Sequence, residues 1–219
     1  TETQFYANQV SQLLLNLGLK KDDKIAIISS NRPEWNFTDL GAQQLGVTAV
    51  PMYPTISEHD YEYIFNDAGI QYAFVGDKTI LNKVQPLLGK SKSLKGIYIF
   101  DKENGATYFW DALPKNIDET AIQKAKDTIT EEDLATIIYT SGTTGNPKGV
   151  MLTHKNIVSN IEGVRQVVHF GYGEKSLSFL PLCHSFERMV FYAYLSYGIH
   201  IHYAESLEKI ADNLQEVKP

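Results

Sequence analysis

The chain has 219 residues, of which 43% are hydrophobic and 21% are charged. This composition supports a buried core and argues against intrinsic disorder. The net charge is −6 and the lysines are scattered, which gives no reason to expect a nucleic acid as partner. The one cysteine, Cys183, excludes an internal disulfide and fits a reducing compartment, so we expect a cytoplasmic protein.

The sequence predicts neither a secretory signal in its first residues nor a membrane-spanning run along its length. No apolar run reaches the about 18–20 residues that a membrane-spanning helix needs, and the first residues lack the basic and apolar pattern of a secretory signal. The chain starts at Thr1 without a methionine and stops at Pro219, just after a helical pattern. We therefore expect a piece of a longer protein.

The first hundred residues alternate between helical and strand patterns. Apolar residues at helical spacing predict a helix over 6–17, which Gly18 is expected to end. Buried strands are predicted at 24–29, 47–51, 71–75 and 96–100. Helices are predicted from Pro33 to about residue 45, from an N-cap at Ser57, and over 77–88.

The second half resumes this alternation after a polar, irregular stretch over 101–133 that holds one predicted helix, 118–126. Strands are predicted at 134–139, 149–153, 177–180 and 199–203, and helices at 155–168, 187–197 and 207–214. Short strands that alternate with helices indicate an α/β layered fold with a largely parallel central sheet flanked by helices. We expect one domain, which can consist of two lobes.

The strongest functional signal is the segment 139–149, YTSGTTGNPKG. Its hydroxyl residues are Thr140, Ser141, Thr143 and Thr144, its glycines are Gly142, Gly145 and Gly149, and its cation is Lys148. Hydroxyls, exposed backbone N–H groups and one lysine make a cradle for phosphate oxygens, and hydroxyls can complete a Mg²⁺ shell. The lysine is followed by glycine and then by a predicted strand, so the segment is not a Walker loop and is expected to join two strands. The competing interpretation is an ordinary flexible loop.

A second constellation, LPLCHSFERM at 180–189, follows a predicted strand. On residue chemistry alone, His184 is either a hydrogen-bonding group at the mouth of a pocket or a structural cap of the next helix, and the cap is favoured. In the structural interpretation, Glu187 and Arg188 form a surface pair. Cys183 is interpreted as a packed thiol because no group that would activate it as a nucleophile is evident.

The run YTSGTTGNPKGVMLTH resembles the phosphate-binding signature of the adenylate-forming superfamily, which contains acyl- and aryl-CoA synthetases, luciferases and amino-acid adenylation domains. The resemblance implies that the segment holds the β- and γ-phosphates of ATP while a carboxylate attacks the α-phosphate. The matching ATP-binding positions are Thr140, Ser141, Gly142, Thr143, Thr144, Gly145 and Lys148. The resemblance further implies a catalytic role for Lys148. We assign Thr144 as the Mg²⁺ ligand.

The LPLCHSFERM segment resembles the acyl-binding motif of long-chain fatty acyl-CoA synthetases. This likeness implies that His184, Glu187 and Arg188 belong to the substrate pocket, with His184 at the junction of acyl group and adenylate, where we also assign it a catalytic role. The run VPMYPTIS at 50–57 also resembles this family, but a proline-ordered turn accounts for it and we assign it no catalytic residue.

The resemblance implies a ligase that forms acyl-AMP and pyrophosphate from a fatty acid and ATP, then transfers the acyl group to CoA. The family's Tyr-Gly-x-Thr-Glu and Thr-Gly-Asp runs and its C-terminal lysine domain are absent from the sequence. Residues 1–219 are therefore expected to be the N-terminal portion of the AMP-binding domain, and inactive alone. The alternatives are an aryl-CoA synthetase, an amino-acid adenylation domain, a non-catalytic phosphate-binding module or a scaffold. The sequence is also compatible with a homodimer and with a peripheral contact at the inner face of the membrane.

Overall fold

The computed structural model describes residues 1–141 and 145–219. Their contacts divide them into two compact units. Unit 1 comprises residues 1–29 and 33–154, and unit 2 comprises residues 30–32 and 155–219. Within the described part of the chain, no helix combines the length and the apolar character needed to span a membrane.

Unit 1 is built on a sheet whose seven described strands lie in the order β5-β4-β3-β1-β2-β6-β7. The strands are β1 (Lys24–Ile28), β2 (Thr48–Met52), β3 (Tyr72–Val75), β4 (Gly96–Ile99), β5 (Thr107–Tyr108), β6 (Leu134–Thr140) and β7 (Lys148–Thr153). Neighbouring strands pair in parallel except for β6 and β7, which are antiparallel. The prediction of a largely parallel central sheet is confirmed.

Several helices of unit 1 begin at a residue whose side chain caps them. The helices of this unit are α1 (Glu2–Asn16), α2 (Pro33–Gln43), α3 (Glu58–Ala68), α4 (Lys78–Val84) with the 3₁₀ turn η1 (Gln85–Leu87), α5 (Phe109–Ala112) and α6 (Glu119–Lys126). The predicted cap Ser57 accepts a hydrogen bond from the Asp60 N–H at 3.1 Å. Gly18, predicted to end the first helix, follows α1 with a left-handed φ of 78°.

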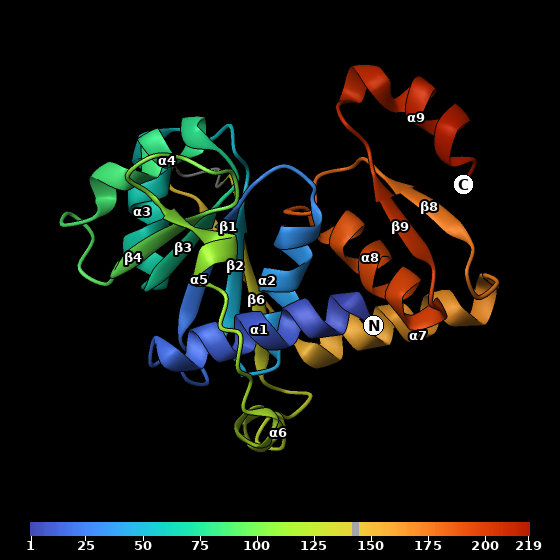
Figure 1. Cartoon of the computed structure of the whole chain (residues 1–219), viewed down its shortest axis with the longest axis horizontal. Coiled ribbons are helices and arrows are strands. Elements are labelled where there is room, and N and C mark those ends of the chain that lie inside the picture. Colours follow the sequence, from blue (N-terminus) through green and yellow to red (C-terminus); the bar gives the residue numbers. More distant parts are fainter. Residues whose placement is uncertain (142–144) are drawn as a thin grey trace. The chain divides into compact units, whose positions relative to one another are not determined.

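Strand order places the helices on two faces of the sheet. The chain steps from β1 to its neighbour β2 and then back across β1 to β3. Because parallel crossovers are right-handed, these opposite steps put α2 and α3 on opposite faces. Figure 1 shows α3 and α4 on one side of the strands and α1 and α2 on the other. Buried side chains of α3 and α4, such as Tyr61, Phe65 and Ile80, pack against Ile28 and Val75 of the sheet.

The stretch 101–133 holds two elements that the sequence did not predict, β5 and α5. Both are short, and tertiary packing holds them: the buried ring of Phe109 lies with its centroid 5.0 Å from that of Phe100 and 6.2 Å from that of Phe74. Such contacts have no periodicity in the sequence. The helix predicted in this stretch is confirmed as α6, capped by Asp118.

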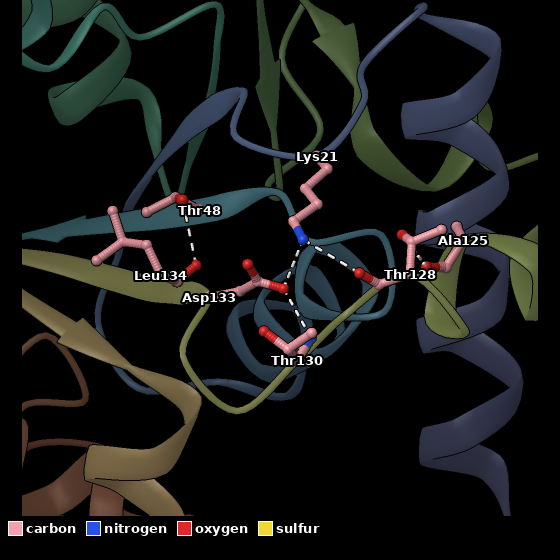
Figure 2. A network of polar contacts seen from close by, with 7 residues as sticks. All are labelled: Lys21, Thr48, Ala125, Thr128, Thr130, Asp133 and Leu134. Atoms are coloured by element: carbon pink, nitrogen blue, oxygen red, sulfur yellow. Dashed lines mark hydrogen bonds and ion pairs between the residues drawn. The ribbon is translucent and has the colours of Figure 1, made fainter.

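A polar network fixes the base of the β6–β7 hairpin (Figure 2). Lys21 Nζ lies 2.6 Å from Asp133 Oδ2 and donates to the Thr128 carbonyl at 3.1 Å. The same carboxylate accepts from the Thr130 N–H at 2.6 Å. The Asp133 carbonyl accepts from the His154 N–H at 3.0 Å. Because Asp133 precedes β6 and His154 follows β7, one residue ties together the two outer ends of the hairpin.

Unit 2 contains a strand–helix–strand unit. Its strands β8 (Lys175–Ser178) and β9 (His200–Tyr203) are parallel and are joined by α8 (Ser185–Tyr197). The other helices are α7 (His154–Val167), the 3₁₀ turn η2 (Leu207–Lys209) and α9 (Ile210–Val217). The strand predicted at 177–180 begins and ends two residues earlier. Its last two predicted residues, Phe179 and Leu180, are 40% and 39% exposed, so the apolar run continues past the strand.

Candidate functional site

The segment 139–149 lies at the tip of the β6–β7 hairpin in unit 1. Pairing across the antiparallel ladder sets Tyr139 opposite Gly149 and Thr140 opposite Lys148. The segment joins two strands, as predicted. Thr140, Ser141 and Lys148 are exposed, so their polar groups are accessible to a ligand at the mouth of the loop.

The middle of this segment bears three of the predicted ATP contacts. Gly142, Thr143 and Thr144, the last of which is also the predicted Mg²⁺ ligand, lie outside the described residues. The next residue, Gly145, is exposed and adopts a φ of 101°, with no atom within 4 Å of where a side chain would begin. Because residues with side chains seldom adopt this conformation, glycine suits the position.

Tyr139 fastens the hairpin to the helix layer. Its hydroxyl donates to Asp67 Oδ2 at 2.5 Å, near the end of α3. Burial, and then the bond to Asp67, raises the pKa of the Tyr139 hydroxyl well above its usual value, so it stays a proton donor. A methyl group on Gly149 would lie 3.1 Å from Tyr139 Cζ and 2.7 Å from Ile137 Cγ2. Gly149 therefore makes room for packed side chains of β6.

His184 lies in unit 2, in the turn between β8 and α8. It is the N-cap of α8, and its Nδ1 accepts from the Phe186 N–H at 3.3 Å. This is the capping role that residue chemistry favours. The residue is exposed all the same. Capping therefore leaves the imidazole accessible to a ligand, and the two interpretations of His184 are compatible.

The surface pair expected of Glu187 and Arg188 is wrong, because both residues are buried, at 7% and 2% exposure. Glu187 Oε1 accepts from the Ser178 hydroxyl at 2.6 Å, and burial raises the pKa of its carboxyl. Arg188 Nε donates to the Tyr192 hydroxyl at 2.9 Å. Charged neighbours at a helix start usually face water, but α8 packs this turn into the core of its unit. Their assignment to a substrate pocket stays a prediction.

Asn31 contacts the turn that bears His184, and no sequence pattern predicted this. Its side-chain amide bonds to Ser178, to Leu180 and to Leu182, and so binds the turn that leads to His184. The separation along the chain between Asn31 and Leu182 is 151 residues, and no local pattern connects them. The one available signal was a polar residue in the loop that follows a buried strand, where ligands of α/β proteins gather.

Cys183 is confirmed as a packed thiol. It is buried, and burial raises its pKa to about 12. The nucleophilic thiolate is therefore scarce at neutral pH. Within the described ranges, no group of three or more His, Cys, Asp or Glu residues could hold a metal ion. The hydroxyls of Thr140 and Ser141 still fit Mg²⁺, because Mg²⁺ takes oxygen ligands and is often bound mainly through water and substrate phosphates.

Solved structures share this fold. A fatty acyl-CoA synthetase of Mycobacterium tuberculosis matches with a TM-score of 0.83 at 21% identity, over 97% of this chain and 41% of that one. A red-emitting luciferase of Phrixothrix hirtus matches with a TM-score of 0.83 at 19% identity, over 99% of this chain and 43% of that one. At these identities the likeness shows the fold alone.

Sequence comparison shows the family. Fatty acyl-CoA synthetase A of Dictyostelium discoideum is 35% identical over 204 residues, which are 84% of this chain and 29% of that protein. Human long-chain-fatty-acid–CoA ligase 1 is 31% identical over 231 residues, or 96% of this chain and 33% of that protein. The chain thus spans about a third of the length of these relatives. Residues 1–219 also match the family described as AMP-binding enzyme, and the chain belongs to that family.

Proposed function

We propose that the protein carrying this chain is an AMP-forming long-chain fatty acid–CoA ligase. In the first step a fatty carboxylate oxygen attacks the α-phosphorus of ATP, and the bond to pyrophosphate breaks. In the second, the sulfur of CoA attacks the acyl carbonyl, AMP leaves, and the thiol proton passes to solvent. The supporting observation is the hairpin that sets Thr140 opposite Lys148 at an exposed loop mouth. The names of the curated relatives support the acyl substrate.

The hairpin supplies what the first step needs. Negative charge builds up on the leaving pyrophosphate, and enzymes that transfer phosphoryl groups act mainly by positioning and by neutralising such charge. Lys148 provides a compact positive charge on one strand, and Thr140, at the end of the other strand, and Ser141, directly after it, provide hydroxyl donors. Mg²⁺ would enter with ATP and neutralise phosphate charge. Asp67 and Asp133 anchor the strands, so the backbone that carries Thr140 and Lys148 is held before ATP binds.

The acyl group is assigned to the turn that bears His184 in unit 2. This turn follows the carboxyl end of a parallel strand, the common place for ligands in α/β folds. We assign residues 1–219 as the N-terminal portion of the AMP-binding domain. Because the remaining ATP and CoA contacts are then expected elsewhere in the protein, the 219-residue chain alone should not form acyl-CoA.

Replacement of Lys148 tests the proposal in the complete protein. In the Lys148→Ala variant we expect ATP–pyrophosphate exchange with palmitate to fall by ~10²-fold or more, the usual effect of removing one charge-stabilising group. The matched control is Lys124→Ala, at an exposed position on α6. Exchange that is unchanged in Lys148→Ala would remove this lysine from the mechanism.

The same assay distinguishes the substrate classes. The wild-type protein should exchange pyrophosphate with palmitate and much less with benzoate or amino acids. A preference for benzoate or for an amino acid would replace the fatty acid with that substrate class. Binding of ATP without exchange for any acid would instead indicate a non-catalytic phosphate-binding module.

A further inference from the structure

The side chain of Asn31 forms hydrogen bonds with one segment of unit 2. Its Nδ2 group donates to Ser178 Oγ at 3.0 Å and to the Leu180 carbonyl at 2.6 Å. Its Oδ1 accepts from the Leu182 N–H at 2.9 Å. Both hydrogens of the amide and its oxygen are therefore used within the stretch that runs from the end of β8 to the turn before α8.

The backbone partners determine which way this amide points. A carbonyl only accepts and an N–H only donates, so the Leu180 and Leu182 groups require Nδ2 on one side and Oδ1 on the other. No carboxylate or hydroxyl offers two donors and an acceptor in this planar arrangement. An asparagine side chain fits here where an aspartate of the same size does not.

The network continues into α8. The Ser178 hydroxyl that accepts from Asn31 donates to Glu187 Oε1 at 2.6 Å. Ser178 is the last residue of β8, and Glu187 lies in the first turn of α8, and both are buried. Buried polar chains of this kind rigidify what they connect, because loss of one member leaves another unsatisfied.

His184 lies between the two anchored points. Leu182, held by Asn31, precedes it by two residues, and Glu187, held by Ser178, follows it by three. The backbone of the exposed histidine is thus fixed from both sides. The loop 30–32 has no predicted role in the reaction, yet its contacts place it in the same compact unit as this turn.

We propose that Asn31 is a positioning residue for the acyl-binding step: it holds the turn 179–184 so that His184 faces the fatty acyl substrate in a fixed place. This inference rests on the proposed function, and it assigns to Asn31 no contact with the substrate. Its effect on the reaction passes through His184.

The test uses Asn31→Asp in the complete protein, with ATP–pyrophosphate exchange as the assay. The change keeps the size of the side chain but replaces the Nδ2 donor with an oxygen that faces the Leu180 carbonyl. We expect the KM for palmitate to rise ~10-fold, in line with the loss of two hydrogen bonds, and the KM for ATP to stay unchanged. Asn66→Asp is the control, because that exposed amide also donates to a backbone carbonyl, within α3.

A double-mutant cycle separates positioning from a general loss of stability. If Asn31 acts through His184, Asn31→Asp should have no further effect on the palmitate KM in a His184→Ala background. Equal effects in both backgrounds, or equal rises in the KM values of ATP and palmitate, would overturn the proposal. Should Asn31→Asp fail to fold, Asn31→Ala removes those two bonds and also the one from the Leu182 N–H, without adding a charge, and the same outcomes apply to it.

Failure of this inference differs from failure of the proposed function. A wild-type protein that shows no exchange with palmitate contradicts the proposed function, and the inference falls with it. A wild-type protein that is active, with an Asn31→Asp variant whose palmitate KM is unchanged, contradicts the positioning role alone.

Discussion

Gly149 shows how single residues shape the hairpin. Its lack of a side chain lets Tyr139 and Ile137 lie across the backbone of β7. Tyr139 in turn bonds to Asp67 and so holds the strand that leads into the loop. The glycine therefore helps to position the loop by making room for packing, although it has no side chain to donate a hydrogen bond.

We expect Gly149→Ala to destabilise the protein by about 1–3 kcal/mol, the usual effect of forcing a methyl group into a packed region. The new methyl would lie 2.7 Å from Ile137 Cγ2 of the neighbouring strand β6, so the isoleucine side chain or the paired backbone must shift. Urea unfolding measures the change. The control is Gly163→Ala in α7, where nothing lies within 4 Å and helix propensity predicts a gain of about 0.5–1 kcal/mol. Equal effects at the two glycines would contradict the packing role.

Residues with a local signature were predictable, and residues defined by distant contacts were not. The hydroxyls, glycines and lysine of 139–149 lie within one short run, so their chemistry is legible in the sequence. Asn31 bonds to atoms that are 147 to 151 residues away. Glu187 and Arg188 are likewise buried because of how α8 packs. The spacing of apolar residues in one helical turn does not predict this packing.

At the scale of elements, the β6–β7 hairpin is held at both its pairing ladder and its base. Its base is held by Asp133, whose backbone bonds to His154 and whose carboxylate bonds to Lys21. The bond to Lys21, and then that to the Thr130 N–H, lowers the pKa of the Asp133 carboxyl. The folded state therefore binds this proton less tightly than the unfolded chain, and the stabilisation is fully present above the unfolded pKa of 3.8.

This linkage predicts a pH-dependent difference between the wild type and Asp133→Asn. The difference in free energy of unfolding should be constant above about pH 5 and should narrow as the pH falls through the folded-state pKa. Urea titrations from about pH 3 to about pH 7 measure it without the ionic screening that guanidinium adds. Lys21→Met should show a smaller narrowing in the same direction, since it removes the lysine but leaves the bond from the Thr130 N–H. A difference that is independent of pH would show that this ion pair does not stabilise the fold.

Long elements with regular spacing were predictable, and short ones were not. Most helices and strands lie within a few residues of their predicted bounds because their apolar spacing and caps are local. The two-residue strand β5 and the four-residue helix α5 depend on the aromatic contacts of Phe109. Strand β8 ends before its apolar run does, because the Leu180 carbonyl bonds to Asn31 and not to a neighbouring strand.

At the scale of the whole molecule, the two proposed halves of the chemistry lie in different compact units. The β6–β7 hairpin, proposed to bind phosphate, belongs to unit 1, and the turn that bears His184 belongs to unit 2. The relatives are about three times as long as this chain, and under the proposed function residues outside it would complete the active site. The central claim nevertheless concerns residues within the chain: the hairpin tip binds the polyphosphate of ATP.

A structure of the complete protein with a non-hydrolysable ATP analogue and Mg²⁺ tests this claim most directly. We expect oxygens of the β- and γ-phosphates within hydrogen-bonding distance of Lys148 Nζ and of donors at Thr140 and Ser141, at the mouth of the loop. A polyphosphate tail bound away from the hairpin, with Lys148 facing solvent, would contradict the account.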